Sequence, residues 1–178
     1  NNGTSKTVDM YVDGAGDVTK NSNIVGGTGA VNNIGVLYGG AAFFYNGAMD
    51  ELRVYNRSLT PTEVGSLYNT GKTYKFEMLG AVEKGGLNDT PAPTASDETG
   101  LVGYWKMDDL TNGNTTDSSG QGNNGVISGA TFNSGRWDKG YSFDGSDDYI
   151  NAGNSTSLNT TATALTVSFW AKADTISA

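Results

Sequence analysis

The chain has 178 residues, a formal net charge of −8, and neither cysteine nor histidine. Disulfides and thiolate or imidazole metal sites are therefore excluded, and the commonest general base is missing. No apolar run is long enough to insert into a membrane, and the cations form no basic patch that would favour nucleic acid. An acidic, polar chain of this kind favours solubility, calcium, or neutral partners such as glycans.

The chain has the composition of an all-β protein. Glycine is abundant, with 26 residues, whereas proline occurs only 3 times, which suits short strands joined by tight turns. Val8, Met10 and Val12 alternate with polar residues and lead into Asp13-Gly14, a strong hairpin signal. Further strands are predicted at residues 34–38, 42–45 and 48–55.

One short helix is predicted at about residues 61–69. Thr60 can cap its first turn, Glu63 completes a capping box, and Pro61 suits the first helical position. Gly71 is expected to close the helix.

Residues 72–99 change character and predict a linker. The end of this segment, residues 88–98, contains no apolar residue larger than alanine or proline. Strands are predicted to resume after Gly100, at residues 101–107, 125–132, 141–144, 149–152 and 164–173. In the last of these, apolar side chains such as Val167 and Phe169 alternate with polar ones, as in a half-buried strand.

Several motifs resemble laminin-G-like, concanavalin A-like jelly-roll domains. Those after the linker match the opening half of such a domain: GLVGYWKMD at 100–108, DSSGQGNNG at 117–125 and YSFDGSDDYI at 141–150. Those before the linker match the closing half: MYVDG at 10–14 and FYNGAMDELRVYNRSLT at 44–60. The resemblance implies an antiparallel β-sandwich whose halves occur in reversed order.

The reversed order predicts a piece of a longer tandem array. Residues 1–71 would be the C-terminal half of one sandwich, 72–99 a linker, and 100–178 the N-terminal half of the following sandwich. The family's middle strands occur on neither side. Because the opening and closing strands are sheet neighbours in the family, residues 101–107 are expected to pair with 49–55, as in a circular permutant.

Asp50, Asp117 and Asp108 are the candidate metal ligands. Asp117 lies in a loop rich in Gly, Ser and Asn, and the expected pairing brings Asp108 towards Asp50. The resemblance to concanavalin A-like sandwiches implies a structural calcium at such a place. The alternative is that Asp50 and Asp117 cap turns through backbone hydrogen bonds. Residues 144–148 lack the spacing of a helix–loop–helix calcium site and predict a hairpin turn.

Trp137 and Tyr45 are the candidate glycan contacts, because both lie near loops where an aromatic ring can stack on a sugar. Trp105 and Phe169 are expected in the core. Catalysis is not expected, since Asp50 and Glu51, as strand neighbours, should point to opposite faces and cannot act as a pair.

The sequence therefore favours a secreted or cell-surface, non-catalytic module that binds a glycan, an extracellular matrix component or a surface protein, next to further repeats of the same chain. Two alternatives stay open. One is a spacer repeat without a ligand, and the other is an accessory module of a secreted glycoside hydrolase.

Overall fold

The computed structural model describes residues 6–22, 33–37, 42–73, 98–136, 138–158 and 164–174. Contacts divide the chain into two compact units, one of residues 1–28 with 59–99 and one of residues 29–58 with 100–178. The expected boundaries of the two half-domains stay a prediction, because most of residues 72–99 lie outside the described part.

The first unit contains the predicted hairpin. Strands β1 (Lys6–Val12) and β2 (Ala15–Ser22) pair antiparallel, with Val12 opposite Ala15. Asp13 and Gly14 make the turn at φ 53° and 76°. Two consecutive positive φ values are those of a type I′ turn, whose twist matches that of the strands it joins.

Helix α1 (Pro61–Thr73) belongs to the same unit and confirms the predicted capping box. Glu63 accepts a hydrogen bond from the Thr60 backbone N–H at 2.7 Å, and Thr60 Oγ1 accepts one from the Glu63 N–H at 3.3 Å. The helix continues past its expected end, so Gly71 lies inside it. A Cβ at Gly14 would come within 2.6 Å of the Tyr68 ring, which shows how closely the helix packs on the hairpin turn. Among the described residues no helix has the length and apolarity needed to cross a bilayer.

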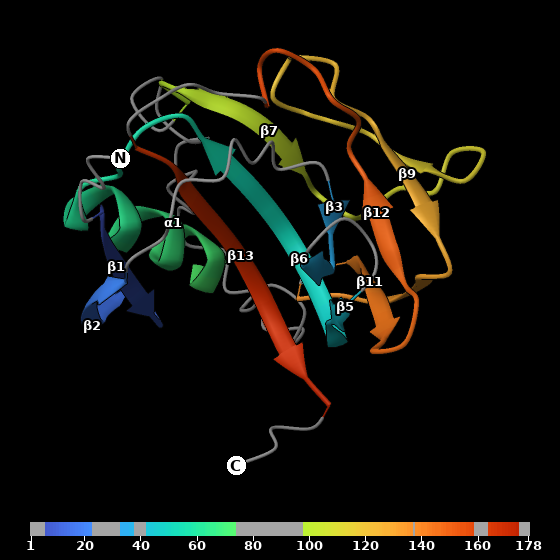
Figure 1. Cartoon of the computed structure of the whole chain (residues 1–178), viewed down its shortest axis with the longest axis horizontal. Helices are drawn as coiled ribbons and strands as arrows, with labels where there is room; N and C mark the ends of the chain where they lie inside the picture. Colours follow the sequence, from blue (N-terminus) through green and yellow to red (C-terminus); the bar gives the residue numbers. More distant parts are fainter. Residues whose placement is uncertain are drawn as a thin grey trace, which may run out of the picture. The chain divides into compact units, whose positions relative to one another are not determined.

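The second unit contains a five-stranded sheet built around one long strand, β6 (Asn46–Tyr55). Its order is β10 (Thr131–Ser134), β11 (Lys139–Asp144), β6 and β13 (Thr166–Ala173), and β7 (Leu101–Trp105) also pairs with β6 (Figure 1). Leu52 lies opposite Trp105 and Arg53 opposite Tyr104. The expected pairing of the strands on either side of the linker is thereby confirmed.

A four-stranded sheet faces it, in the order β3 (Asn33–Ile34), β12 (Tyr149–Asn151), β9 (Gly125–Ser128) and β8 (Asn114–Thr115). Strands β4 (Val36–Leu37) and β5 (Ala42–Phe44) form a separate pair.

Two of the expected connections differ from the structure. The single strand predicted at 125–132 is two strands in different sheets, because Gly129, at φ 76°, turns the chain between β9 and β10. The prediction of a hairpin at residues 144–148 is wrong as well. These residues connect β11 with β12, which belong to opposite sheets and do not pair.

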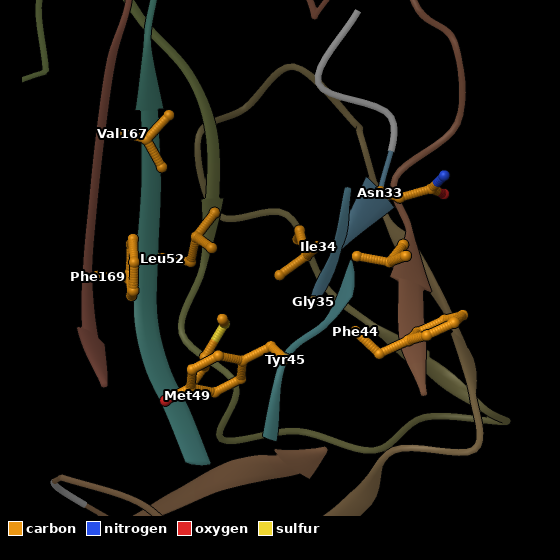
Figure 2. A pocket seen from close by; sticks show the side chains of 10 residues that line it. Asn33, Ile34, Gly35, Phe44, Tyr45, Met49, Leu52, Val167 and Phe169 are labelled. Atoms are coloured by element: carbon orange, nitrogen blue, oxygen red, sulfur yellow. The ribbon is translucent and has the colours of Figure 1, made fainter. Parts of the chain in front are cut away.

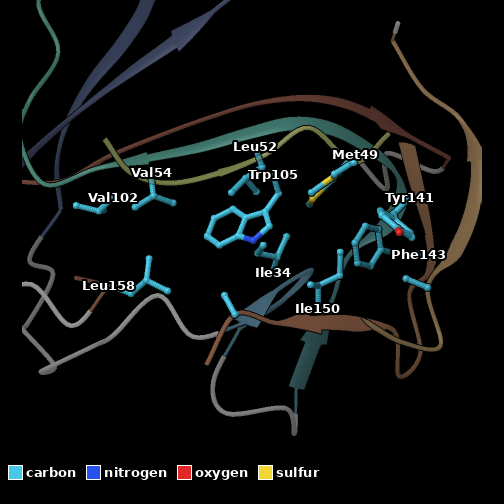
Figure 3. Packing of buried hydrophobic residues seen from close by; sticks show 13 residues of the cluster. Ile34, Met49, Leu52, Val54, Val102, Trp105, Tyr141, Phe143, Ile150 and Leu158 are labelled. Atoms are coloured by element: carbon cyan, nitrogen blue, oxygen red, sulfur yellow. The ribbon is translucent and has the colours of Figure 1, made fainter. Parts of the chain in front are cut away.

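The core lies between these two sheets (Figure 3). Trp105, Tyr141 and Ile150 are fully buried, and they come from β7, β11 and β12. Both sheets therefore contribute to one apolar layer, which confirms the antiparallel β-sandwich. The expectation that Phe169 lies in the core is wrong, because this residue is 45% exposed.

Candidate ligand-binding face

A bulge in β6 sets which side chains reach the outer face of the five-stranded sheet. Asp50 lies opposite Trp170 and Arg53 opposite Ser168, so two residues of β6 face one residue of β13. Glu51 sits at this irregularity with φ 54°, a left-handed value that few non-glycine residues adopt.

The bulge corrects the expected alternation. Met49 and Leu52 both belong to the core, although they are three residues apart. Regular alternation would send them to opposite faces, so the extra residue is taken up between them. Asp50 and Glu51 consequently both lie on the outer side of the sheet.

Glu51, Arg53 and Tyr104 form a closed polar cluster on this outer side. Arg53 donates to Glu51 Oε2 at 2.6 Å and to the Tyr104 hydroxyl at 2.6 Å, and the Tyr104 hydroxyl donates to Glu51 at 2.5 Å. The Arg53 guanidinium lies 4.0 Å from the centre of the Tyr104 ring. Burial raises the pKa of Tyr104 and Glu51 raises it further, against the opposing effect of Arg53, so the phenol stays a donor. The Lys106 ammonium lies 5.9 Å from the same ring.

A second cluster joins Asp50, Arg136 and Trp170. The Arg136 backbone N–H donates to Asp50 Oδ2 at 2.6 Å, and its guanidinium lies 4.5 Å from the centre of the Trp170 ring. Asp50 is only 3% exposed. Gly135 allows this approach, since a Cβ there would lie 2.7 Å from Asp50 Oδ2. The carboxylate therefore fixes the turn that presents Arg136.

Strand β13 completes the face. Because Trp170 points outwards, alternation places Ser168 and Lys172 on the same side. We call this surface the outer patch; it consists of Glu51, Arg53, Tyr104, Lys106, Arg136, Trp170 and Lys172. Most of these residues belong to β6, β7 and β13. Lys106 directly follows β7, and Arg136 lies in the turn between β10 and β11.

Asp117, a predicted metal ligand, is buried, and each of its carboxylate oxygens accepts two hydrogen bonds. Oδ1 accepts from the N–H groups of Tyr104 and Ser119 at 2.9 Å each, and Oδ2 accepts from Asn123 N–H at 2.8 Å and Ser119 Oγ at 2.9 Å. The residue thus ties its loop to β7. This is the role that the capping alternative predicted.

Asp50 and Asp108 hold opposite ends of one turn. Asp108 Oδ1 accepts from the Lys139 N–H at 3.1 Å, three residues beyond the Arg136 N–H that Asp50 binds. In the described part of the chain, the three acidic residues whose ligand atoms gather within 4.8 Å are instead Asp144, Asp147 and Asp148. Calcium binding by Asp50, Asp117 and Asp108 stays a prediction.

Tyr45, a predicted ligand contact, lines an apolar pocket of about 390 Å³ at the inner side of β13 (Figure 2). Its hydroxyl donates to the Ala48 carbonyl at 3.2 Å, and its ring packs edge-on against Phe143. Phe44, Val167 and Phe169 line the same pocket. The pocket offers a ligand few polar groups. Trp137, the other predicted contact, lies outside the described residues.

The sequence profile of the concanavalin A-like lectin/glucanases superfamily, laminin-G type, matches residues 2–65. This segment is therefore similar to laminin-G-like domains. The match includes all of β6 and ends before β7, so it covers the part identified above as the closing half. Searches of characterised proteins and of solved structures gave no match. The superfamily name unites sugar-binding proteins with enzymes that cleave glucans.

Sequence reasoning did not find the outer patch, although part of the signal is present. The polar set of β13 contains Trp170 and Lys172, and a large aromatic side chain among outward polar residues marks a surface. In the laminin-G-like segment itself, Arg53 lies between the inward Leu52 and Val54. The contribution of Arg136 could not be inferred, because it depends on a buried contact with Asp50, 86 residues earlier.

Proposed function

We propose that the chain is a non-catalytic glycan-binding module and that the outer patch is its binding surface. The observation that carries the proposal is the pair of guanidinium–aromatic contacts on one sheet face, Arg53 with Tyr104 and Arg136 with Trp170. Such a module acts outside the cell or at its surface, where glycans are presented.

The chemistry of the patch suits a sugar ring. The apolar face of a pyranose packs against an aromatic side chain, while its hydroxyl groups need planar donors and acceptors at the ring edge. Tyr104 and Trp170 supply aromatic surface beside the guanidinium groups that lie on their rings, and Arg53, Glu51 and Arg136 supply the polar groups. Their positions are fixed by paired strands and by each other, which lowers the entropy lost on binding.

The same contacts argue against hydrolysis. Glycoside cleavage needs two carboxyl groups that flank the bond and are free to exchange protons. Asp50 is buried against the Arg136 N–H, and Glu51 Oε2 accepts from both Arg53 and Tyr104. Both carboxylates on this face are therefore engaged in holding neighbouring groups.

A glycan array probed with the folded chain tests the proposal. We expect binding to at least one oligosaccharide, a loss of that binding in Trp170→Ala, and no release of reducing sugar. Phe132→Ala is the matched control, because Phe132 is an exposed aromatic residue that pairs with the inward-facing Tyr141. A folded chain that binds no glycan would favour the spacer repeat instead. Equal binding by the two variants would remove the outer patch as the site.

A further inference from the structure

The cations of the second unit are distributed unevenly. Its Lys and Arg residues all lie on or next to strands of the five-stranded sheet: Arg53, Arg57, Lys106, Arg136, Lys139 and Lys172. Strands β3, β12, β9 and β8 of the facing sheet contain none. In a chain with a net charge of −8, positive charge is thus concentrated on one of the two sheets.

Within the outer patch, the exposed charges are those of the two lysines, whereas the acidic Glu51 is largely buried. Lys106 and Lys172 are exposed, and Arg136 lies between them on Trp170. Glu51 is 12% exposed and paired with Arg53, and Asp50 lies beneath the Arg136 turn. Asp108, Asp138 and Asp174 flank the patch, and Asp108 Oδ1 accepts a hydrogen bond from the Lys139 N–H. At the centre of the patch, a ligand therefore meets the two lysine ammonium groups and the Arg136 guanidinium.

The cations are spaced for a chain of sugars. Lys172 lies on β13 at the level of Ala48, and Lys106, which follows Trp105 of β7, lies at the level of Glu51 on the other side of β6. Strands β13 and β7 lie on opposite sides of β6, which separates the two lysines by about 10 Å across the sheet, and their levels along β6 differ by three residues, one of them in the bulge. Trp170, at the level of Asp50, lies between the levels of the two lysines and provides a place for a sugar ring.

We infer that the glycan recognised by the outer patch is acidic and carries carboxylate or sulfate groups along an oligosaccharide. This inference rests on the proposed function and narrows it. Net charge alone favoured a neutral glycan, whereas the local arrangement gives charge complementarity to an anionic one. The two exposed lysines bind acidic groups at either end, and Arg136 binds one near the centre.

Three immobilised polysaccharides test the inference: neutral galactan, sulfated galactan and polygalacturonate. We expect binding to one or both acidic polymers, with little binding to neutral galactan, and affinity roughly fivefold lower at high than at low salt. Sulfated galactan and polygalacturonate separate the two sources of negative charge. The double variant Lys106→Gln/Lys172→Gln should bind roughly fivefold to tenfold more weakly.

Lys139→Gln is the matched control. It also removes a positive charge, but alternation along β11 places Lys139 with the inward Tyr141, and its ammonium lies 5.9 Å from the Phe132 ring. Its affinity should stay close to that of the unchanged chain. Binding to neutral galactan that matches the acidic polymers and is insensitive to salt would overturn the inference and leave the glycan-binding function intact. An absence of binding to any glycan would overturn both.

Discussion

The inner face of the five-stranded sheet differs between its two ends. At the β7 and β11 end, Trp105 and Tyr141 are fully buried, whereas at the β13 end Val167 and Phe169 are 43% and 45% exposed. The same alternation of apolar and polar residues therefore gives a closed core in one place and an open surface in another. Alternation specifies which face of a strand is apolar; it does not specify whether another sheet covers that face.

The facing sheet explains the difference. Its edge strand near β13 is β3, which has only two residues, Asn33 and Ile34. The pocket lined by Tyr45, Val167 and Phe169 is the space between β3 and β13. At the other end, β12 and β9 bring Ile150 and Ile127 to the core.

The largest expected effect comes from the closed end. Trp105→Ala removes a side chain that lies at the centre of the core and whose Nε1 donates to the Asn123 carbonyl at 2.8 Å. We expect a loss of about 3–5 kcal/mol in the free energy of unfolding. Denaturant titration followed by circular dichroism measures it. A loss below about 1 kcal/mol would mean that the core is not closed there.

Asp117→Ala should have the next largest effect. It leaves three buried or partly buried N–H groups, on Tyr104, Ser119 and Asn123, without their acceptor. We expect a loss of about 2–3 kcal/mol, against less than about 0.5 kcal/mol for the exposed Asp147→Ala. Equal melting temperatures for the two variants would contradict the role assigned to Asp117.

A smaller effect is expected from pH through Asp109. Burial raises the pKa of this carboxyl group, but hydrogen bonds from Thr116 and Thr115 outweigh burial and lower it below its ordinary value. A lowered pKa stabilises the fold above the unfolded-state value near 4, and this contribution is lost as the pH falls through the folded-state value. The melting temperature of Asp109→Asn should therefore depend less on pH in acid than that of the unchanged chain. The pH dependence of Thr116→Val should lie between those of the other two proteins. Parallel melting curves against pH for all three proteins would exclude this coupling.

The smallest effect is expected at the open end. Phe169→Ala removes a side chain of similar apolar character to Trp105, but one that keeps nearly half of its surface in water. We expect a loss of about 1 kcal/mol or less. If the loss equals that of Trp105→Ala, the inner face of β13 must be covered, and the contrast between the two ends would be wrong.

Most of the strands could be predicted from the sequence, because alternation and turn residues act locally. The turn at Asp13-Gly14 and the capping box at Thr60 are examples, since each depends on residues a few positions apart. The pairing of β6 with β7 was predicted from the resemblance of the two halves to one family, which supplied long-range information that periodicity lacks.

Two features could not be predicted, and both depend on a single backbone position. Gly129 sends β9 and β10 to different sheets, and Glu51 shifts the alternation of β6. A glycine does not by itself indicate a change of sheet, and a glutamate gives no signal for a left-handed φ. The outer patch depends on the second of these, because the bulge brings Asp50 and Glu51 to the same side.

The outer patch exists only if β6 and β7 pair in the observed register, and a disulfide tests this directly. Arg53 and Tyr104 lie directly opposite each other, and such pairs have Cβ atoms about 4.5–5.5 Å apart, near the distance a disulfide requires. The chain has no other cysteine to compete. We predict that Arg53→Cys/Tyr104→Cys oxidises to a monomeric cross-linked species, seen by mass spectrometry after proteolysis, and that the shifted pair Arg53→Cys/Lys106→Cys does not. Cross-linking of the shifted pair alone, or only between molecules, would contradict the pairing and the binding face built on it.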